Sequence, residues 1–150
     1  MNEFPKSRGH AGGSVSLVDG EPAIRRARQL MLRSENYDVR SYATCAALLS
    51  DPRSRDYSCI VVDVHMGEVD GIDLLKSMRA SGWHGRGILL DSIQPGTALM
   101  QDAERFGDRV LKRTIADGPL IAAIGDSIDR AGRPPMGDLK ALRPRKLHSD

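Results

Sequence analysis

The sequence is short of cysteine, of long hydrophobic runs and of any large excess of one charge. Its two cysteines, Cys45 and Cys59, stand in neither a metal-binding nor a redox spacing, so we expect reduced thiols and a cytoplasmic protein without a secretory leader. No apolar run approaches the roughly 20 residues that a membrane span needs. The net charge of +2 comes from Lys and Arg scattered along the chain, which argues against a nucleic-acid or membrane footprint. The histidines lack the spacing of a metal cluster; they are His10, His65, His84 and His148.

What is present is a chain of 150 residues with 40% hydrophobic content, which is enough for one domain with its own core. We predict a disordered lead-in over residues 1–13, because this stretch has no hydrophobic period. The folded domain is predicted over 14–130. Residues 131–150 are rich in Pro, Gly and basic residues, which predicts a flexible, solvated tail; contact with an acidic partner or with nucleic acid is the alternative.

Strand and helix patterns alternate along the predicted domain. The predicted strands are 14–18, 37–43, 58–64, 87–90 and 109–112. One predicted helix begins at Pro22, and the other four cover 45–50, 71–81, 96–107 and 118–128. Parallel strands require such crossovers. We therefore predict an α/β fold: a doubly wound, five-stranded parallel sheet of the flavodoxin-like order 2-1-3-4-5, with helices on both faces.

Hydrophobic periodicity also predicts which helix faces meet the core. In the first helix, Ala23, Ala27, Leu30 and Met31 share one face, and this face is predicted to be buried. The later helices carry similar stripes, made by Ile72, Leu75 and Met78 and by Leu120, Ile121, Ile124 and Ile128.

Acidic residues follow the first and third predicted strands. Asp19 and Asp63 are expected in one crevice, because ligands of open α/β sheets collect at the carboxyl ends of the strands. Glu21 follows closely enough to reach the same place. Converging carboxylates suit Mg²⁺ and phosphoryl transfer to a carboxylate. A single Asp after a strand is more often a turn or cap residue, but the pair favours a functional site.

These residues lie in segments that resemble the receiver domain of two-component response regulators. The segments are "SLVDGEPAIRRA", "CIVVDVHMGEVDGIDLLKSMR" and "RVLKRT", and they follow the order and spacing of that family. The resemblance covers residues 14 to about 130 and includes Met66, Asp70 and Gly71 around Asp63. It is closest to the branch with a helix-turn-helix output domain, although no output domain is expected here.

The resemblance implies roles for particular residues. Asp63 is the phosphoacceptor, which takes a phosphoryl group from a sensor histidine kinase or a phosphotransfer protein. A Mg²⁺ site is implied at Asp19, Asp63 and the backbone carbonyl of His65, with Glu21 as a further candidate ligand.

Five positions depart from the family pattern. Gly20 replaces the second metal-binding acid, so the Mg²⁺ site is expected to be weakened. Asp91 replaces the Thr or Ser that would hydrogen-bond the phosphoryl group, and a carboxylate there would repel it.

Arg113 replaces Lys and keeps its charge but not its geometry. Thr114 replaces a Pro that is often cis; without Pro the cis form costs about 2.5 to 4 kcal/mol, which predicts a trans loop. Val110 replaces the aromatic switch residue.

Two arrangements of the altered site stay open at this stage. Ser92 would take the place of Asp91 if the strand slipped by one residue, although its side chain would then point to the other face. Arg113 is predicted to form an internal ion pair with Asp91 or with Asp63, where the family has metal and phosphate.

The leading interpretation is a stand-alone, atypical receiver that acts through protein–protein interaction, with phosphorylation of Asp63 weak or absent, and that is not an enzyme. An aspartyl-nucleophile phosphohydrolase on the same fold is the alternative, and it would need a second acid and a substrate cap. A flavin-binding module is disfavoured because no phosphate-binding loop follows the first strand.

The expected partners are a sensor histidine kinase or phosphotransfer protein and a downstream protein target. Neither membrane contact nor direct DNA binding is expected. The resemblance implies a homodimer or partner surface over the helix at 96–107, the strand at 109–112 and the helix at 118–128. Arg105, Asp108 and Arg109 are the charged residues expected to form ion pairs there.

Overall fold

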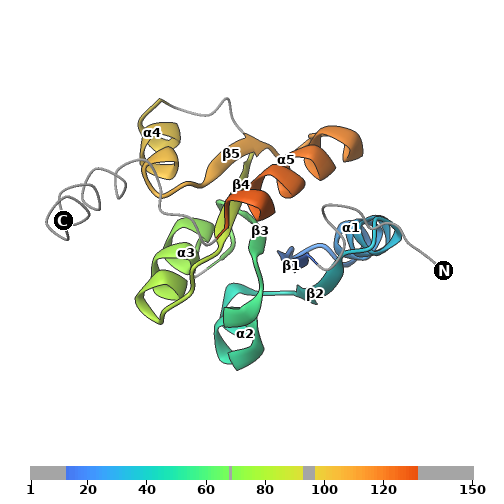
Figure 1. Cartoon of the computed structure of the whole chain (residues 1–150), viewed down its shortest axis with the longest axis horizontal. Helices are drawn as coiled ribbons and strands as arrows, with labels where there is room; N and C mark the ends of the chain where they lie inside the picture. The colour runs from blue at the N-terminus through green and yellow to red at the C-terminus, as the bar shows by residue number, and fades with distance from the viewer. Residues whose placement is uncertain (1–12, 68, 93–96, 132–150) are drawn as a thin grey trace, which may run out of the picture.

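The computed structural model describes residues 13–67, 69–92 and 97–131, and in them strands and helices alternate as predicted (Figure 1). The elements are β1 (Ser14–Val18), α1 (Pro22–Ser34), β2 (Asp38–Tyr42), α2 (Cys45–Ser50), η2 (Pro52–Asp56), β3 (Cys59–Asp63), α3 (Gly71–Ala80), β4 (Arg86–Asp91), α4 (Thr97–Arg105), β5 (Arg109–Lys112) and α5 (Asp117–Arg130). The predicted lead-in and tail lie almost entirely outside the described residues.

The strands form one parallel sheet in the order β2-β1-β3-β4-β5, which confirms the predicted fold class. The register places Val18 opposite Val62, Asp63 opposite Leu90, and Asp91 opposite Lys112. The carboxyl ends of β1, β3, β4 and β5 therefore lie together, and the residues that follow them share one edge of the sheet.

Two hydrophobic clusters cover the two faces of the sheet. Along β3, Ile60 and Val62 belong to the cluster with α2, α3 and α4, whereas Cys59 and Val61 belong to the cluster with α1 and α5. This alternation is the period of two that a strand buried on both faces requires. The two helix layers lie on opposite sides of the sheet (Figure 1), as predicted.

The face of α1 that packs on the sheet differs from the prediction. Leu30 is 57% exposed, and Ala23 and Ala27 are exposed too, whereas Leu32 is fully buried; only Met31 of the predicted stripe packs against the core, and it is half-buried. The inward positions in the first turns of the helix are taken by arginines, because these turns lie over the polar end of the sheet. There Arg25 Nη1 donates to the backbone oxygen of Asp19 at 2.8 Å.

The short 3₁₀ helix η2 was not predicted. Pro52 occupies its first turn, and the Asp51 side chain caps it by accepting a hydrogen bond from the Arg53 backbone N–H at 3.1 Å. Such a cap needs only one Asp before a Pro, and hydrophobic periodicity does not report it.

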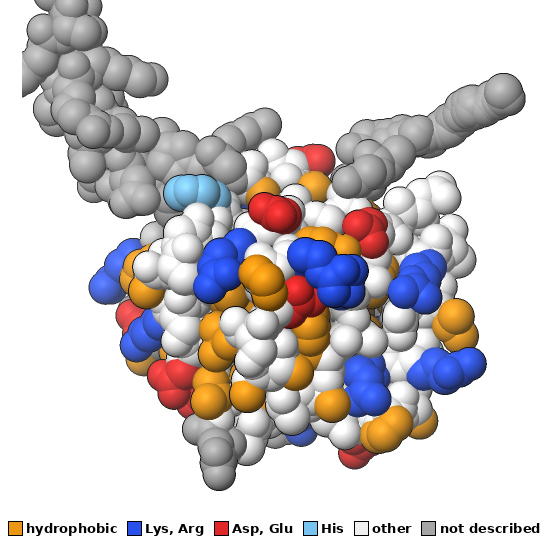
Figure 2. Space-filling model, turned by 90° about the horizontal axis from the view of Figure 1, so that it is seen from below, with side chains coloured by type: hydrophobic (Ala, Val, Ile, Leu, Met, Phe, Trp, Pro, Cys, Tyr) orange, Lys and Arg blue, Asp and Glu red, His pale blue; other side chains and the backbone are white. Residues whose placement is uncertain are grey.

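The surface mixes charges of both signs. Figure 2 shows one face on which basic, acidic and hydrophobic side chains are interspersed. Nothing on that face resembles the continuous basic stripe that nucleic-acid binding uses. None of the helices in the described ranges is both long and apolar enough to cross a membrane.

Candidate functional site

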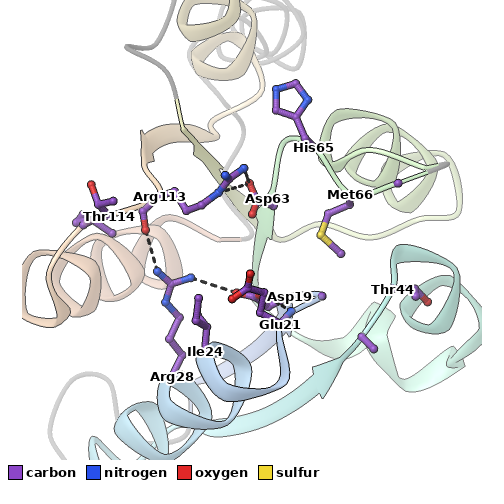
Figure 3. A pocket seen from close by; sticks show the side chains of 14 residues that line it. Asp19, Glu21, Ile24, Arg28, Thr44, Asp63, His65, Met66, Arg113 and Thr114 are labelled. Atoms are coloured by element: carbon purple, nitrogen blue, oxygen red, sulfur yellow. Dashed lines mark hydrogen bonds and ion pairs between the residues drawn. The ribbon is translucent and has the colours of Figure 1, made fainter.

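A crevice of about 690 Å³ opens at the carboxyl edge of the sheet (Figure 3). It is lined by Asp19, Gly20, Glu21, Ile24, Arg28, Ala43, Thr44, Asp63, His65, Met66, Gly67, Arg113, Thr114 and Ile115. Asp19, Glu21 and Asp63, which the sequence predicted to converge, all reach it. The parallel register explains this, because β1 and β3 are neighbours whose ends coincide.

Asp63 is the last residue of β3, and its side chain is 16% exposed. Arg113, which follows β5, donates to one oxygen of this carboxylate: Nε lies 3.0 Å and Nη2 lies 2.5 Å from Oδ1. Hydrogen bonding to Asp63 is the main reason why the pKa of Arg113 is raised above its usual value. Of the two predicted ion-pair partners, Asp91 and Asp63, Arg113 therefore pairs with Asp63.

Asp19 follows β1 and is buried. Its Oδ1 accepts a hydrogen bond from the backbone N–H of Glu21 at 2.9 Å, and its Oδ2 lies 3.5 Å from Nη1 of Arg28. Glu21 is exposed at the start of α1 and lines the crevice. Both oxygens of Asp19 are thus engaged by the chain itself.

Gly20 lies on an open part of the crevice. A Cβ added there would meet nothing closer than the backbone oxygen of Ala43 at 4.0 Å. A Cβ at this position therefore fits without any shift of the backbone.

Asp91 occupies the end of β4, where it is 5% exposed, while Ser92 is exposed. The structure therefore places Asp91, and not Ser92, at the strand end beside Asp63. His65 Nε2 lies 4.0 Å from Asp91 Oδ1, and the His65 side chain is 65% exposed. The ring lies at the outer rim of the crevice (Figure 3).

The loop after β5 is held by the backbone. The N–H of Arg113 donates to the oxygen of Asp91 at 2.8 Å, and the peptide bond before Thr114 is trans, as predicted. Val110 is buried in the cluster under α3 and α4.

Gly71 sets the approach of α3 to Asp63. A Cβ added there would lie 2.4 Å from the backbone oxygen of Asp63, so only glycine fits. The helix begins here because Asp70 caps it, with Oδ1 accepting from the Asp73 N–H at 2.9 Å. The Asp-Gly pair in the sequence is thus a structural requirement of the site.

Arg28 is the residue of the crevice that the sequence analysis missed. Its Nη2 donates to the backbone oxygen of Arg113 at 3.0 Å, in addition to the Asp19 contact (Figure 3). The available signal was the spacing of three between Arg25 and Arg28, which places both on one face of a helix directly after Asp19.

Asp108 corrects another expectation. It was assigned to an intermolecular surface, but it is 4% exposed and bonded within the chain to Arg79 and to the N–H of Gly87. Arg109 pairs with Asp126 of α5 at 3.9 Å.

Comparison with known proteins agrees with this geometry. The family profile described as the response regulator receiver domain matches residues 15–123. The transcriptional regulatory protein FixJ of Azorhizobium caulinodans is 30% identical over 118 residues, which are 78% of this chain and 56% of that protein. FixJ of Bradyrhizobium diazoefficiens is 32% identical over 120 residues, 79% of this chain and 58% of that protein. The chain thus spans little more than half the length of these relatives.

Solved structures share the fold. Full-length FixJ from B. japonicum superposes with a TM-score of 0.70 at 26% identity, covering 82% of this chain and 61% of that one. The chemotaxis protein CheY4 of Vibrio cholerae gives a TM-score of 0.68 at 21% identity, covering 78% and 99%. The second likeness speaks for the fold alone.

Proposed function

The chain belongs to the response regulator receiver domain family, and from that premise we propose that it is an atypical receiver that signals by binding proteins, with phosphorylation of Asp63 weak or absent. Its setting is two-component signalling. Receiver domains are generally signalling modules and not enzymes, which favours this function over the phosphohydrolase.

The ion pair between Arg113 and Asp63 carries the proposal. Two charge-assisted hydrogen bonds reach one oxygen of the carboxylate that would attack a phosphoryl donor. Such bonds contribute about 1.5 to 3 kcal/mol each, and an attack by Oδ1 must give them up or share them. Asp91, at the neighbouring strand end, adds a negative charge that would repel the incoming phosphoryl group.

The proposal includes partners. Receiver domains interact with histidine kinases or phosphotransfer proteins, and we assign this chain one of these and a downstream protein target. We propose α4, β5 and α5 as its homodimer or partner surface, and no direct contact with DNA. A cytoplasmic location fits Cys45 and Cys59, which are buried and free.

Intact-mass spectrometry after incubation with acetyl phosphate and Mg²⁺ tests the proposal. We expect the wild type to gain little or no phosphoryl mass, and Arg113→Lys to gain roughly tenfold more, since the lysine loses the two-bond geometry on Asp63. Asp63→Asn is the control that must gain none. Gly20→Asp, whose Cβ would meet no atom closer than 4.0 Å, reports whether the missing acid also limits the reaction.

Stoichiometric phosphorylation of the wild type, absent in Asp63→Asn, would overturn the proposal. In that outcome the protein is a working receiver in which Arg113 does not prevent phosphorylation of Asp63.

A further inference from the structure

Arg28 is largely shielded from solvent in the crevice although it lies on a surface helix. Its side chain is 12% exposed, and its guanidinium reaches both the Asp19 carboxylate at 3.5 Å and the Arg113 backbone oxygen at 3.0 Å. A side chain of this length loses about 2 kcal/mol of rotamer freedom when it is fixed in this way, so the two contacts must offset that cost. It joins β1, α1 and the loop after β5 (Figure 3).

Receiver domains typically bind Mg²⁺ at the phosphorylation site, and the residues present here do not fit that ion. Asp19 is bound to Arg28, Asp63 is bound to Arg113, and the position of the further acid is Gly20. Mg²⁺ needs near-octahedral oxygen ligands at about 2.0 to 2.1 Å and does not share them readily with a cation. Within the described residues, no group of three His, Cys, Asp or Glu side chains is placed to hold a metal.

The charges of the crevice support the same conclusion. A guanidinium group faces each carboxylate at the ends of β1 and β3: Arg28 faces Asp19, and Arg113 faces Asp63. A divalent cation would have to displace one or both of them, or stay within a few ångströms of like charge in a partly desolvated site.

We propose that Arg28 is the resident counter-ion of Asp19 and takes the place of the divalent cation, so that this crevice does not load Mg²⁺. The inference rests on the proposed function, because it concerns the same crevice. It goes beyond that function by naming the group that replaces the metal and by making the site independent of divalent cations.

Binding of Mn²⁺, a paramagnetic substitute for Mg²⁺, tests this by electron paramagnetic resonance of the free ion. We compare the wild type, Gly20→Asp, Arg28→Gln and the double variant Gly20→Asp with Arg28→Gln. Arg26→Gln is the matched control, because Arg26 is exposed on the same helix and the change in charge is identical.

We expect no saturable binding of Mn²⁺ by the wild type or Arg26→Gln at millimolar concentrations. The double variant should bind about tenfold more tightly than Gly20→Asp alone, because removal of one positive charge beside Asp19 lowers the repulsion. Should Arg28→Gln fail to fold, Arg28→Lys is the second variant. It keeps the positive charge but replaces the planar guanidinium with a single ammonium group. Combined with Gly20→Asp, it is expected to give an intermediate affinity.

Two results would overturn the inference: wild-type binding as tight as that of the double variant, or equal affinity of Gly20→Asp and the double variant. No phosphoryl donor or partner is present in this assay, so its failure is separate from that of the proposed function. If acetyl phosphate phosphorylates the wild type stoichiometrically in EDTA, weak phosphorylation is wrong and the Arg28 inference stands. If stoichiometric phosphorylation occurs only with Mg²⁺, both are wrong.

Discussion

The Asp108 carboxylate joins three segments of the chain through direct hydrogen bonds. Its Oδ1 accepts from the Gly87 N–H at 2.7 Å and from Arg79 Nη2 at 2.6 Å, and its Oδ2 accepts from Arg79 Nη1 at 2.8 Å. The Arg79 guanidinium also lies over the rings of Trp83 and Phe106, at 5.3 and 5.5 Å from their centroids. The start of β4, the end of α3 and the start of β5 are thereby fixed together.

We expect Asp108→Ala to lower the free energy of unfolding by about 2 to 4 kcal/mol, since it leaves a buried N–H and a largely buried guanidinium without their acceptor. Urea unfolding at neutral pH measures this. The control is Asp102→Ala: that side chain is 70% exposed and lies 3.8 Å from Arg105, so its loss should change stability by less than about 0.5 kcal/mol. Equal effects of the two variants would show that the Asp108 contacts do not stabilise the domain.

At the same scale, the sequence predicted the acids of the crevice and one of the two cations that pair with them. Asp19 and Asp63 could be placed together because each follows a strand, and parallel strands end at one edge. Arg113 was predicted to pair with Asp91 or with Asp63, and the structure pairs it with Asp63. Arg28 was not predicted: its spacing from Arg25 places both on one face of the helix, but its contact with Asp19 also depends on how far α1 tilts over the sheet, which that spacing does not specify.

At the scale of elements, α1 shows where hydrophobic periodicity fails. The pattern has two competing faces, and the wrong one, with Ala23, Ala27 and Leu30, was predicted to be buried. The structure buries Leu32 and turns Leu30 outward. The observed rotation brings Arg25 and Arg28 into contact with Asp19, whereas α3 and α5 pack largely as their stripes predict.

A pair of substitutions tests this rotation. Leu32→Ala should destabilise the domain by about 3 kcal/mol, as expected for a leucine lost from a core, and Leu30→Ala should change stability by less than about 0.5 kcal/mol. Both remove the same atoms from the same helix, so thermal or urea unfolding compares the two positions directly. If Leu30→Ala lost more stability than Leu32→Ala, the buried face of α1 would be the one that periodicity predicted.

At the scale of the whole molecule, the sheet separates two cores that each contain one buried thiol. Cys45 lies in the cluster under α2, α3 and α4, and Cys59 lies in the cluster under α1 and α5. Burial raises the pKa of Cys45 to about 11 and that of Cys59 further above its usual value. Each layer therefore holds a thiol whose ionisation would lower the stability of the domain.

These thiols make the domain less stable at alkaline pH. In the unfolded chain a thiol loses its proton near pH 9, whereas in the folded chain Cys45 keeps it to about 11, so the folded state binds more protons in between. The contribution is complete below pH 9 and is lost as the pH rises to about 11. Tyr37, Tyr42 and Tyr57, whose pKa values are also raised, act in the same direction.

We therefore expect the free energy of unfolding, measured in urea from pH 7 to 10.5, to fall above pH 9. The fall should be shallower in Cys45→Ala. The comparison is between the slopes of the free energy of unfolding with pH, so the tyrosines, which are present in both proteins, do not account for the difference.

Because one sheet joins both cores, the two thiols should also become reactive toward a thiol reagent over the same range of urea concentration. Earlier exposure of Cys45 than of Cys59 would mean that the α2, α3 and α4 layer opens by itself, and the slope of stability with pH would then describe that layer and not the whole domain.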